Sequence, residues 1–237
     1  MHDRNQTHLS TRNHILNALP QEDYERLHSN LERVNLTLGE ILYHPDEQIK
    51  YVYFPENAMV SIIATTSDGQ SAEVGVVGRE GVVGIDVLMG VESTSNECMV
   101  LLADGALRIK TEIIRKEFKQ NGAFHDISLL YIHALMMQIS QTALCNRLHS
   151  IEQRLSRWLL MCHDRSTSDT LTLTQDFLAV MLGVNRPSVT TTAILLQGGG
   201  FIKYSRGKIT ILDREGLEDF ACDCYQVVKP EYDRLEK

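Results

Sequence analysis

The sequence predicts an α+β fold in three parts: an N-terminal β jelly roll, a long helix and a C-terminal winged helix-turn-helix. Short strand-like runs with turn residues between them fill the stretch from about 34 to 109. A heptad-spaced apolar pattern follows from about 124. A helix, a glycine turn, a second helix and two short strands then occupy 173–212. We therefore divide the chain into a β domain at 1–122, a helix and hinge at 123–160, and a third domain with a C-terminal tail at 161–237.

The N-terminal part combines short helices with a strand-rich region. Apolar residues between 14 and 27 have helical spacing on either side of Pro20. The Asp68-Gly69 step lies between two β-prone runs and predicts a hairpin. Four glycines between 75 and 84 then indicate the bends of a small barrel or jelly roll.

A heptad pattern marks the long helix. Apolar residues recur at alternating steps of four and three from Leu130 to Trp158, and Gln141 is the polar residue inside this pattern. Its length favours pairing with the same helix of a second copy, in which a buried Gln141 fixes the register. The alternative is a long helix packed on its own domain. The predicted homodimer interface comprises Leu130, Ala134, Met137, Gln141, Leu144 and Leu148.

The cysteines are odd in number and scattered, at Cys98, Cys145, Cys162, Cys222 and Cys224. This distribution indicates reduced thiols rather than a disulfide framework. Cys222 and Cys224 form a CxC pair, but no matching pair lies near it in the sequence, and zinc or iron–sulfur sites generally need four ligands. We therefore expect no metal site and interpret the cysteines as small buried apolar residues.

The composition is that of an ordinary globular protein, with 43% hydrophobic and 23% charged residues among 237. No stretch approaches the roughly 18 uninterrupted apolar residues of a membrane helix. The first 15 residues are polar, unlike a signal peptide, so we expect a cytoplasmic protein without membrane contacts. The sequence has no nucleophile elbow, phosphate loop or HExxH pair, which argues against an enzyme.

The helix-turn-helix signal at 173–200 is the most informative part of the chain. Thr174 is a suitable N-cap for the first helix, and Gly183 ends it. Asn185 caps the second helix, about 185–197, with Pro187 in its first turn. The outward face of this helix has short hydroxyl side chains and one guanidinium, which suits entry into the major groove of DNA. A plain helical hairpin, the alternative, would present more Glu and Lys to solvent.

Residues 201–212 predict a two-stranded wing with its turn at Arg206-Gly207. The net charge is −8, yet no acidic residue lies between Asp176 and Asp213. Basic side chains on such a wing contact phosphates and supply affinity rather than specificity, whereas the alternative is an ordinary solvated hairpin. The predicted DNA-binding residues are Thr174, Gln175, Arg186, Pro187, Ser188, Thr190, Thr191, Lys203, Ser205, Arg206 and Lys208.

The segment LTLTQDFLAVMLGVNRPSVTTTAILLQGGGFIKYSRGKITILDREGL resembles the C-terminal domain of the Crp/Fnr family of bacterial transcription regulators. The order of parts upstream is similar to that family as well, strongly over about 150–217 and loosely over 30–110. The resemblance implies a cyclic-nucleotide-binding-like jelly roll, a dimerising helix and a recognition helix that reads a palindromic operator in double-stranded DNA. An activator of this kind would also contact RNA polymerase.

Two positions of the recognition helix depart from the family pattern, which is an Arg-Glu pair with a second Arg four residues after the Glu. Arg186 matches the first Arg, whereas Pro187 replaces the Glu and Thr191 replaces the second Arg. The family's best-known operator is therefore not transferred to this chain. We expect a larger contribution from DNA shape and phosphate contacts.

The β domain departs further from the family. Relatives that bind cyclic nucleotides have a Gly-Glu pair for the ribose and an Arg-Ser pair for the phosphate, but Arg79 is the only arginine in the corresponding segment, 78–103. Ordinary cAMP binding is therefore not expected, and neither is an iron–sulfur cluster, because no cysteine precedes Cys98. We expect no cofactor, and the binding of some other small effector is left open. Its predicted pocket residues are Arg79, Glu80 and Asp86, with a surface turn and an ion pair as the alternative.

A second functional hypothesis follows from the substituted recognition positions and the acidic total charge. In it the chain is a ligand-sensing module that acts through protein contacts and does not bind DNA.

Overall fold

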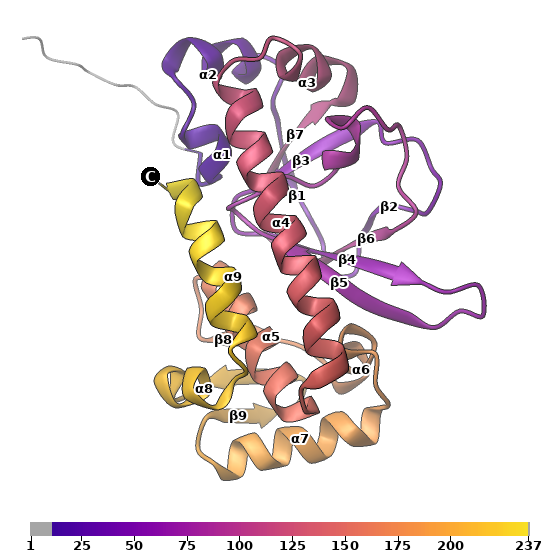
Figure 1. Ribbon diagram of the computed structural model, residues 1–237, viewed down its shortest axis with the longest axis vertical. Helices are drawn as coiled ribbons and strands as arrows, with labels where there is room; N and C mark the ends of the chain where they lie inside the picture. The colour runs from indigo at the N-terminus through magenta and orange to yellow at the C-terminus, as the bar shows by residue number, and fades with distance from the viewer. Residues whose placement is uncertain (1–10, 237) are drawn as a thin grey trace, which may run out of the picture.

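The computed structural model describes residues 11–236, with side chains through Leu235. The N-terminal part builds two antiparallel sheets, ordered β1-β7-β3 and β2-β6-β4-β5, which share one core (Figure 1). Its elements are α1 (His14–Asn17), α2 (Gln21–His28), β1 (Glu32–Asn35), β2 (Ile41–Tyr43), β3 (Tyr51–Pro55), β4 (Met59–Thr65), β5 (Ser71–Val77), η1 (Ile85–Val87), β6 (Glu97–Leu102), β7 (Gly105–Lys110) and α3 (Thr111–Phe118).

The core of this domain follows from strand alternation. Phe54 and Ile109 come from one sheet and Val60, Val77 and Val100 from the other, and all five are buried in a single cluster. The turn predicted between two β-prone runs is confirmed as the loop that joins β4 to β5. The α+β prediction with an N-terminal β sandwich is confirmed.

The long helix α4 (Ala123–Leu148) runs nearly the length of the molecule, from the α1–α3 end to the α7 end (Figure 1). Its inner face buries Phe124, Tyr131 and Leu135 against the β domain. Gln138 is fully buried on the same face, where its Oε1 accepts a hydrogen bond of 2.7 Å from the backbone N–H of Val76. A buried amide thus pins the helix to β5.

The prediction of one continuous heptad helix from Leu130 to Trp158 is wrong at its C-terminal end. The helix stops at Leu148, and a separate helix, α5 (Ile151–Arg165), starts with Ser150 as its N-cap. Ser150 and Gln153 form a capping box, which satisfies two backbone donors that a continuous helix would have paired internally. The last part of the heptad pattern, including Leu155 and Trp158, therefore belongs to the buried face of another helix.

The C-terminal part confirms the winged helix-turn-helix. A third sheet, ordered β8-β10-β9, supports the two helices of the motif. The elements are β8 (Thr170–Thr172), α6 (Gln175–Leu182), α7 (Arg186–Gly198), β9 (Ile202–Ser205), β10 (Lys208–Ile211), α8 (Arg214–Phe220), α9 (Cys224–Asp233) and η2 (Arg234–Glu236).

The last helix does not stay with the winged domain. It turns back and packs beside α4, as Figure 1 shows for α9 in yellow. Val228 and Tyr232 join the core of the N-terminal domain, and Gln138 of α4 donates a hydrogen bond to the Tyr232 hydroxyl. The segment predicted as a C-terminal tail is therefore a structural part of the long-helix region.

The winged domain rests directly on the outer face of the four-stranded sheet. Met59, Ile63 and Val76 from this sheet share one buried cluster with Trp158 of α5 and Leu178 of α6. Helix α6 also lies against β5. The position of the helix-turn-helix relative to the β domain is thus set by an apolar interface.

By length and composition α4 is apolar enough to cross a membrane, and it is the one such helix in the part of the chain that the structure describes. A third of its most apolar window is buried inside the protein. The buried side packs on β5 and α9, which is the behaviour of a core helix in a globular domain.

Candidate nucleic-acid interface

The helix-turn-helix is built from local capping interactions. Thr174 Oγ1 accepts a hydrogen bond of 3.2 Å from the backbone of Phe177 and starts α6. Gly183 ends α6 in the left-handed region, with φ of +60°, where a side chain would be strained. Asn185 Oδ1 then accepts a bond of 3.0 Å from the Ser188 N–H and starts α7. These three predicted turn residues fix the angle between the helices.

Helix α7 forms the end of the molecule opposite α1 and α2 (Figure 1). Its inner stripe, Val189, Ala193 and Leu196, is buried as predicted. Its outer side presents the predicted residues Arg186 and Thr191 to solvent. The orientation of α7 therefore leaves one whole face open.

Two contacts hold the exposed side chains at the start of α7. The Arg186 guanidinium, 61% exposed, lies 3.6 Å from the Asp176 carboxylate of α6. Thr190 Oγ1 donates a hydrogen bond of 2.8 Å to Gln175 Oε1, which joins the two helices. Both pairs consist of groups with the hydrogen-bonding capacity to contact DNA bases or phosphates.

The wing adds the basic part of the surface. Its turn places Arg206 and Gly207 at φ of +50° and +75°, the left-handed backbone of a tight hairpin. Lys203, Arg206 and Lys208 are exposed on it, together with Ser205. Gly207 accepts a backbone hydrogen bond from Leu173, immediately before α6. The wing turn and the start of the helix-turn-helix therefore form a continuous surface.

Sequence reasoning missed the apolar part of α7. Ile194 and Leu195 are 66% and 46% exposed, and Val180 on α6 is exposed as well. Their helical spacing resembled that of core residues, so the sequence alone did not separate them from the buried stripe. An exposed apolar side chain on this face can contact the methyl group of thymine.

The predicted dimer residues divide into exposed and covered groups. Leu130, Leu144 and Leu148 are exposed, Met137 and Gln141 are half-buried, and Ala134 is fully buried in its own domain. Ala134 is unavailable to a second chain because it lies in the core that α9 completes. The exposed apolar residues of α4 are Leu129, Leu130, Met136, Ile139, Leu144 and Leu148. The open face of the helix is thus rotated by about one residue from the predicted one.

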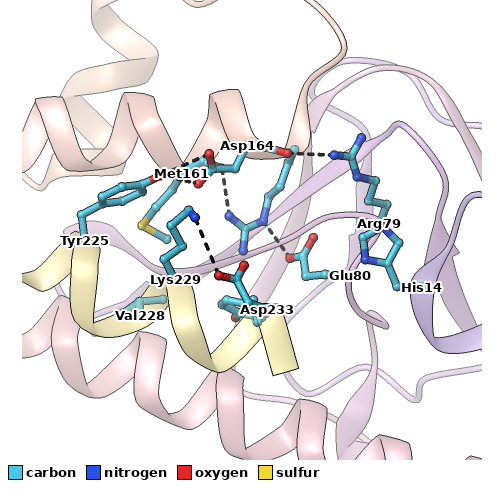
Figure 2. A pocket seen from close by; sticks show the side chains of 11 residues that line it. His14, Arg79, Glu80, Met161, Asp164, Tyr225, Val228, Lys229 and Asp233 are labelled. Atoms are coloured by element: carbon cyan, nitrogen blue, oxygen red, sulfur yellow. Dashed lines mark hydrogen bonds and ion pairs between the residues drawn. The ribbon is translucent and has the colours of Figure 1, made fainter. Parts of the chain in front are cut away.

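Two of the three predicted effector residues line one cavity. Arg79 and Glu80 border a space of about 170 Å³ between the β domain, α5 and α9 (Figure 2). Asp86 lies elsewhere, within η1, and does not line this cavity. The volume is below the roughly 300 Å³ of ordinary small-molecule sites.

Charged groups already occupy the walls of this cavity. Arg165 is buried, and its Nε lies 2.7 Å from Glu80 Oε1 in an ion pair. Arg79 donates a hydrogen bond of 3.1 Å to the Asp164 carbonyl. Glu80 therefore forms an ion pair, as the alternative interpretation of this turn predicted. Its partner, Arg165, comes from another domain rather than from the turn itself.

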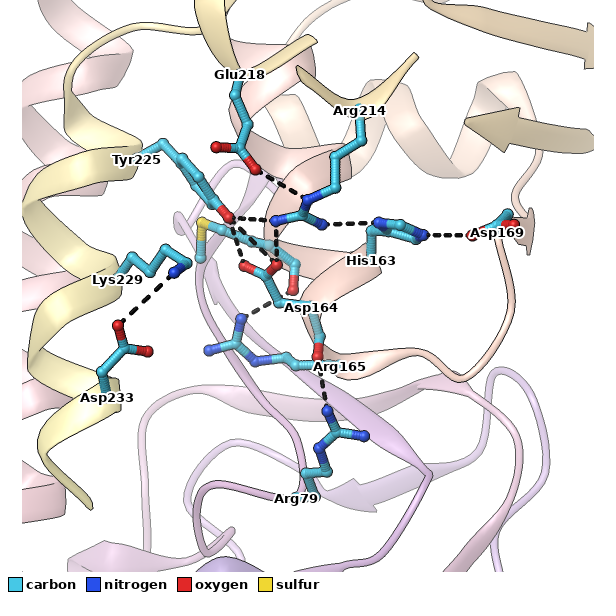
Figure 3. Close-up of polar contacts among 11 residues, drawn as sticks. Arg79, His163, Asp164, Arg165, Asp169, Arg214, Glu218, Tyr225, Lys229 and Asp233 are labelled. Carbon is cyan, nitrogen blue, oxygen red and sulfur yellow. Dashed lines mark hydrogen bonds and ion pairs between the residues drawn. The ribbon is translucent and has the colours of Figure 1, made fainter. Parts of the chain in front are cut away.

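Asp164 extends the network into the winged domain, as Figure 3 shows. Its carboxylate accepts hydrogen bonds from Arg214 at 2.6 Å and from the Tyr225 hydroxyl at 2.9 Å. Burial, with the negative charge of Asp164, raises the pKa of Tyr225. Arg214 continues to His163 Nδ1 at 2.8 Å. The network connects the β domain, α5, α8 and α9.

All five cysteines are free and buried, as expected, and three of them also lie together in one cluster. The fold brings Cys145, Cys222 and Cys224 together with His149, and the four ligand atoms lie within 4.8 Å of one another. This arrangement is not apparent from residue order, because Cys145 and Cys222 are 77 positions apart.

The chain thus has a winged helix-turn-helix docked on a β sandwich through a long helix. Residues 153–220 match the family model of the Crp-like helix-turn-helix domain. No curated protein matches the chain.

Solved structures share the fold across most of the chain. A crp/fnr-family transcriptional regulator from Eubacterium rectale is 18% identical and has a TM-score of 0.68, covering 87% of this chain and 96% of that one. FixK2 from Bradyrhizobium japonicum is 15% identical, with a TM-score of 0.69 and coverage of 81% and 98%. The c-di-GMP responsive global regulator CLP from Xanthomonas campestris is 17% identical, with a TM-score of 0.62 and coverage of 81% and 99%.

Residues 153–220 therefore match a Crp-like helix-turn-helix domain, and the chain as a whole shares the fold of these Crp/Fnr-type structures.

Proposed function

We propose that the chain works in the cytoplasm as a homodimer that controls transcription by binding a palindromic operator, with α7 in the major groove and the β9–β10 wing on the backbone. The observation that carries this proposal is the continuous exposed surface of α7 and the wing. It displays Arg186, Lys203, Arg206 and Lys208, and no acidic residue lies within 177–212. A duplex attracts such a surface electrostatically despite the negative total charge.

Arg186 is the residue that best fits base recognition. It is the only charged side chain on α7, and a guanidinium can bind guanine O6 and N7 in a bidentate manner. Free of DNA, it lies beside Asp176 at 3.6 Å, and this exposed pair is weak in water. Arg186 can therefore exchange its contact with Asp176 for one with the edge of a guanine base at little cost in free energy.

The basic residues of the wing contribute to DNA affinity rather than to sequence specificity in this proposal. Lys203, Arg206 and Lys208 project from a rigid hairpin whose turn is held by the Leu173–Gly207 hydrogen bond. Such side chains neutralise phosphates and release counterions irrespective of sequence.

The dimer contact uses the open face of α4. Leu129 and Met136 lie two helical turns apart on it and are 46% and 61% exposed, an apolar stripe that an isolated monomer would leave in water. Leu130 and Leu144, two of the residues predicted from the heptad pattern, border the same stripe. Two-fold pairing along α4 would present two copies of α7 to one DNA duplex, in keeping with the dimerising helix that the Crp/Fnr resemblance implies.

The test starts from sequences selected by the purified full chain from a random duplex pool. We expect a two-fold symmetric site with half-sites about 34 Å apart, one helical turn. Binding of the selected site and of a scrambled duplex is then measured over a range of salt concentrations. Arg186→Ala should weaken the selected site by about 1–3 kcal/mol and leave the scrambled duplex nearly unchanged.

Lys208→Ala should weaken both duplexes and reduce the salt slope by about one unit. Lys119→Ala is the matched control, since this lysine is exposed at the opposite end of the molecule and should change neither duplex. Equal losses for Arg186→Ala and Lys119→Ala would refute the proposed docking.

Dimerisation is tested separately by sedimentation. Met136→Glu should produce a monomer that has lost the selected site, whereas Leu38→Glu, at an equally exposed leucine of the β domain, should remain dimeric. A dimeric Met136→Glu variant would exclude this face of α4.

A further inference from the structure

We propose that this chain binds one Zn²⁺ ion through Cys145, His149, Cys222 and Cys224. Three thiols and one imidazole form the Cys₃His ligand set of structural zinc sites. Cys145 lies near the end of α4 and His149 caps that helix. Cys222 lies in the turn between α8 and α9, and Cys224 is the first residue of α9.

The distances fit a single tetrahedral ion. With Zn–S of about 2.3 Å and Zn–N of about 2.0 Å, tetrahedral geometry places two sulfurs about 3.8 Å apart and a sulfur and a nitrogen about 3.5 Å apart. Here Cys145 Sγ and Cys222 Sγ are 3.4 Å apart, and Cys224 Sγ and His149 Nδ1 are 3.5 Å apart. All four atoms lie within 4.8 Å of one another, so small side-chain rotations complete the site.

Burial indicates a closed structural site. Cys145, Cys222 and Cys224 are at most 4% exposed, and only the His149 ring reaches solvent, at 21%. Four protein ligands leave no open position for a water or substrate, which is the arrangement of a structural rather than a catalytic zinc. An iron–sulfur cluster is a poorer fit, because it binds its ligands through different iron atoms and spreads them farther apart.

Neighbouring groups complete the surroundings of the ion. The Asp223 carboxylate lies 3.7 Å from His149 Nε2, on the ring nitrogen that does not face the thiols. Carboxylates in this position orient metal-binding histidines. The buried Arg157 interacts electrostatically with Cys145 and Cys224, and its Nε has no hydrogen-bond partner among the described residues. This positive charge offsets the net negative charge of zinc bound to three thiolates.

A bound zinc ion would cross-link two segments of the chain. The site connects the end of α4 to the segment in which the chain leaves the winged domain and enters α9. Zinc would thereby fix the winged domain to the long helix. This inference does not depend on the DNA contacts proposed above.

The test uses the full chain, stripped with a chelator under reducing conditions and titrated with ZnCl₂ or with Co²⁺ as a spectroscopic probe. We expect one ion per chain and, for Co²⁺, the intense visible bands of a tetrahedral thiolate site. Cys145→Ser and Cys224→Ser should lower zinc affinity more than Asp223→Asn, for which a loss of roughly 10- to 100-fold is expected. Cys98→Ser and Cys162→Ser, two buried cysteines outside the cluster, should retain full binding.

A second measurement uses the unaltered chain, so its outcome does not depend on whether the variants fold. In the unaltered chain, zinc should slow alkylation of Cys145, Cys222 and Cys224, as located by peptide mass spectrometry, and leave Cys98 unaffected. The proposal is overturned if the refolded chain takes up less than one ion in ten chains. Equal alkylation rates with and without zinc, or a Cys145–Cys222 disulfide formed in place of zinc uptake, would overturn it as well.

Discussion

Glu73 on β5 makes the stability of the docked structure depend on pH. It is 6% exposed, its Oε1 accepts a hydrogen bond of 2.6 Å from Trp158 Nε1, and Ser61 donates to its other oxygen. Burial raises the pKa of Glu73 to about 7 from the ordinary value of 4.5, although these hydrogen bonds favour the charged form. The folded protein therefore prefers the neutral carboxyl group.

The sign of the effect follows from linkage. The contribution of Glu73 to stability is complete below about pH 4.5, where it is protonated in both states, and is lost as the pH rises through about 7. A pKa raised from 4.5 to about 7 corresponds to a loss on the order of 3 kcal/mol at alkaline pH. Glu73→Gln keeps a neutral hydrogen-bonding group of the same shape, so it should remove this loss.

Urea unfolding measured from about pH 5 to pH 8.5 tests the prediction. At the alkaline end Glu73→Gln should be more stable than the unaltered chain by up to about 3 kcal/mol, and the difference should shrink below about 1 kcal/mol at pH 5. The control is Glu47→Gln, which removes an exposed carboxylate and should follow the unaltered chain. A stability difference for Glu73→Gln that stays constant across the pH range would refute the reasoning.

Three further predictions concern single contacts, each checked by the free energy of unfolding. Glu80→Ala leaves the buried Arg165 unpaired and should cost about 3–5 kcal/mol, whereas loss of the exposed Glu32 carboxylate in Glu32→Gln should cost less than about 1 kcal/mol; equal costs would contradict the burial argument. Asn185→Ala removes the cap of α7 and should cost about 1 kcal/mol, and Asn185→Asp should restore most of it. Gly183→Ala forces a side chain into the left-handed region and should cost about 1–2 kcal/mol; an unchanged midpoint would show that the turn relaxes.

The winged helix-turn-helix was predictable because its determinants are local. Thr174, Gly183 and Asn185 act on backbone groups within four residues, so their roles can be read from sequence order alone. The wing turn at Arg206-Gly207 is local in the same sense. The two sheets were predictable as strands, but their pairing depends on contacts that no local pattern specifies.

The long helix shows where periodicity stops being sufficient. A heptad pattern identifies an apolar face, but it does not say whether a second chain or α9 covers that face. Here α9 supplies part of the cover, and Gln138 rather than Gln141 is the buried glutamine. The helical spacing of Tyr225, Val228 and Tyr232 is a usable signal for α9, although it lies within the acidic last 25 residues.

The candidate zinc site and the Glu80–Arg165 pair lay beyond sequence reasoning for a different reason. Each joins segments more than 70 residues apart, and the ligand spacing within each segment, CxC or Cys-x-x-x-His, is too short to indicate a site alone. These residues are brought together only by the tertiary fold. The sequence therefore supplied the correct residue types and could not supply their association.

Besides the apolar interface with the sheet, three polar contacts that are largely buried hold α5 and the segment after α8 against the rest of the chain. Trp158 bonds to Glu73 of the sheet, Arg165 pairs with Glu80, and Cys145 meets the cysteines that follow α8. An apolar interface alone would tolerate sliding, because apolar contacts have little directionality. Buried hydrogen bonds and ion pairs are lost on small displacements and leave unpaired groups behind. The three contacts therefore oppose displacement of α5 relative to the sheet, and α7 packs directly on α5.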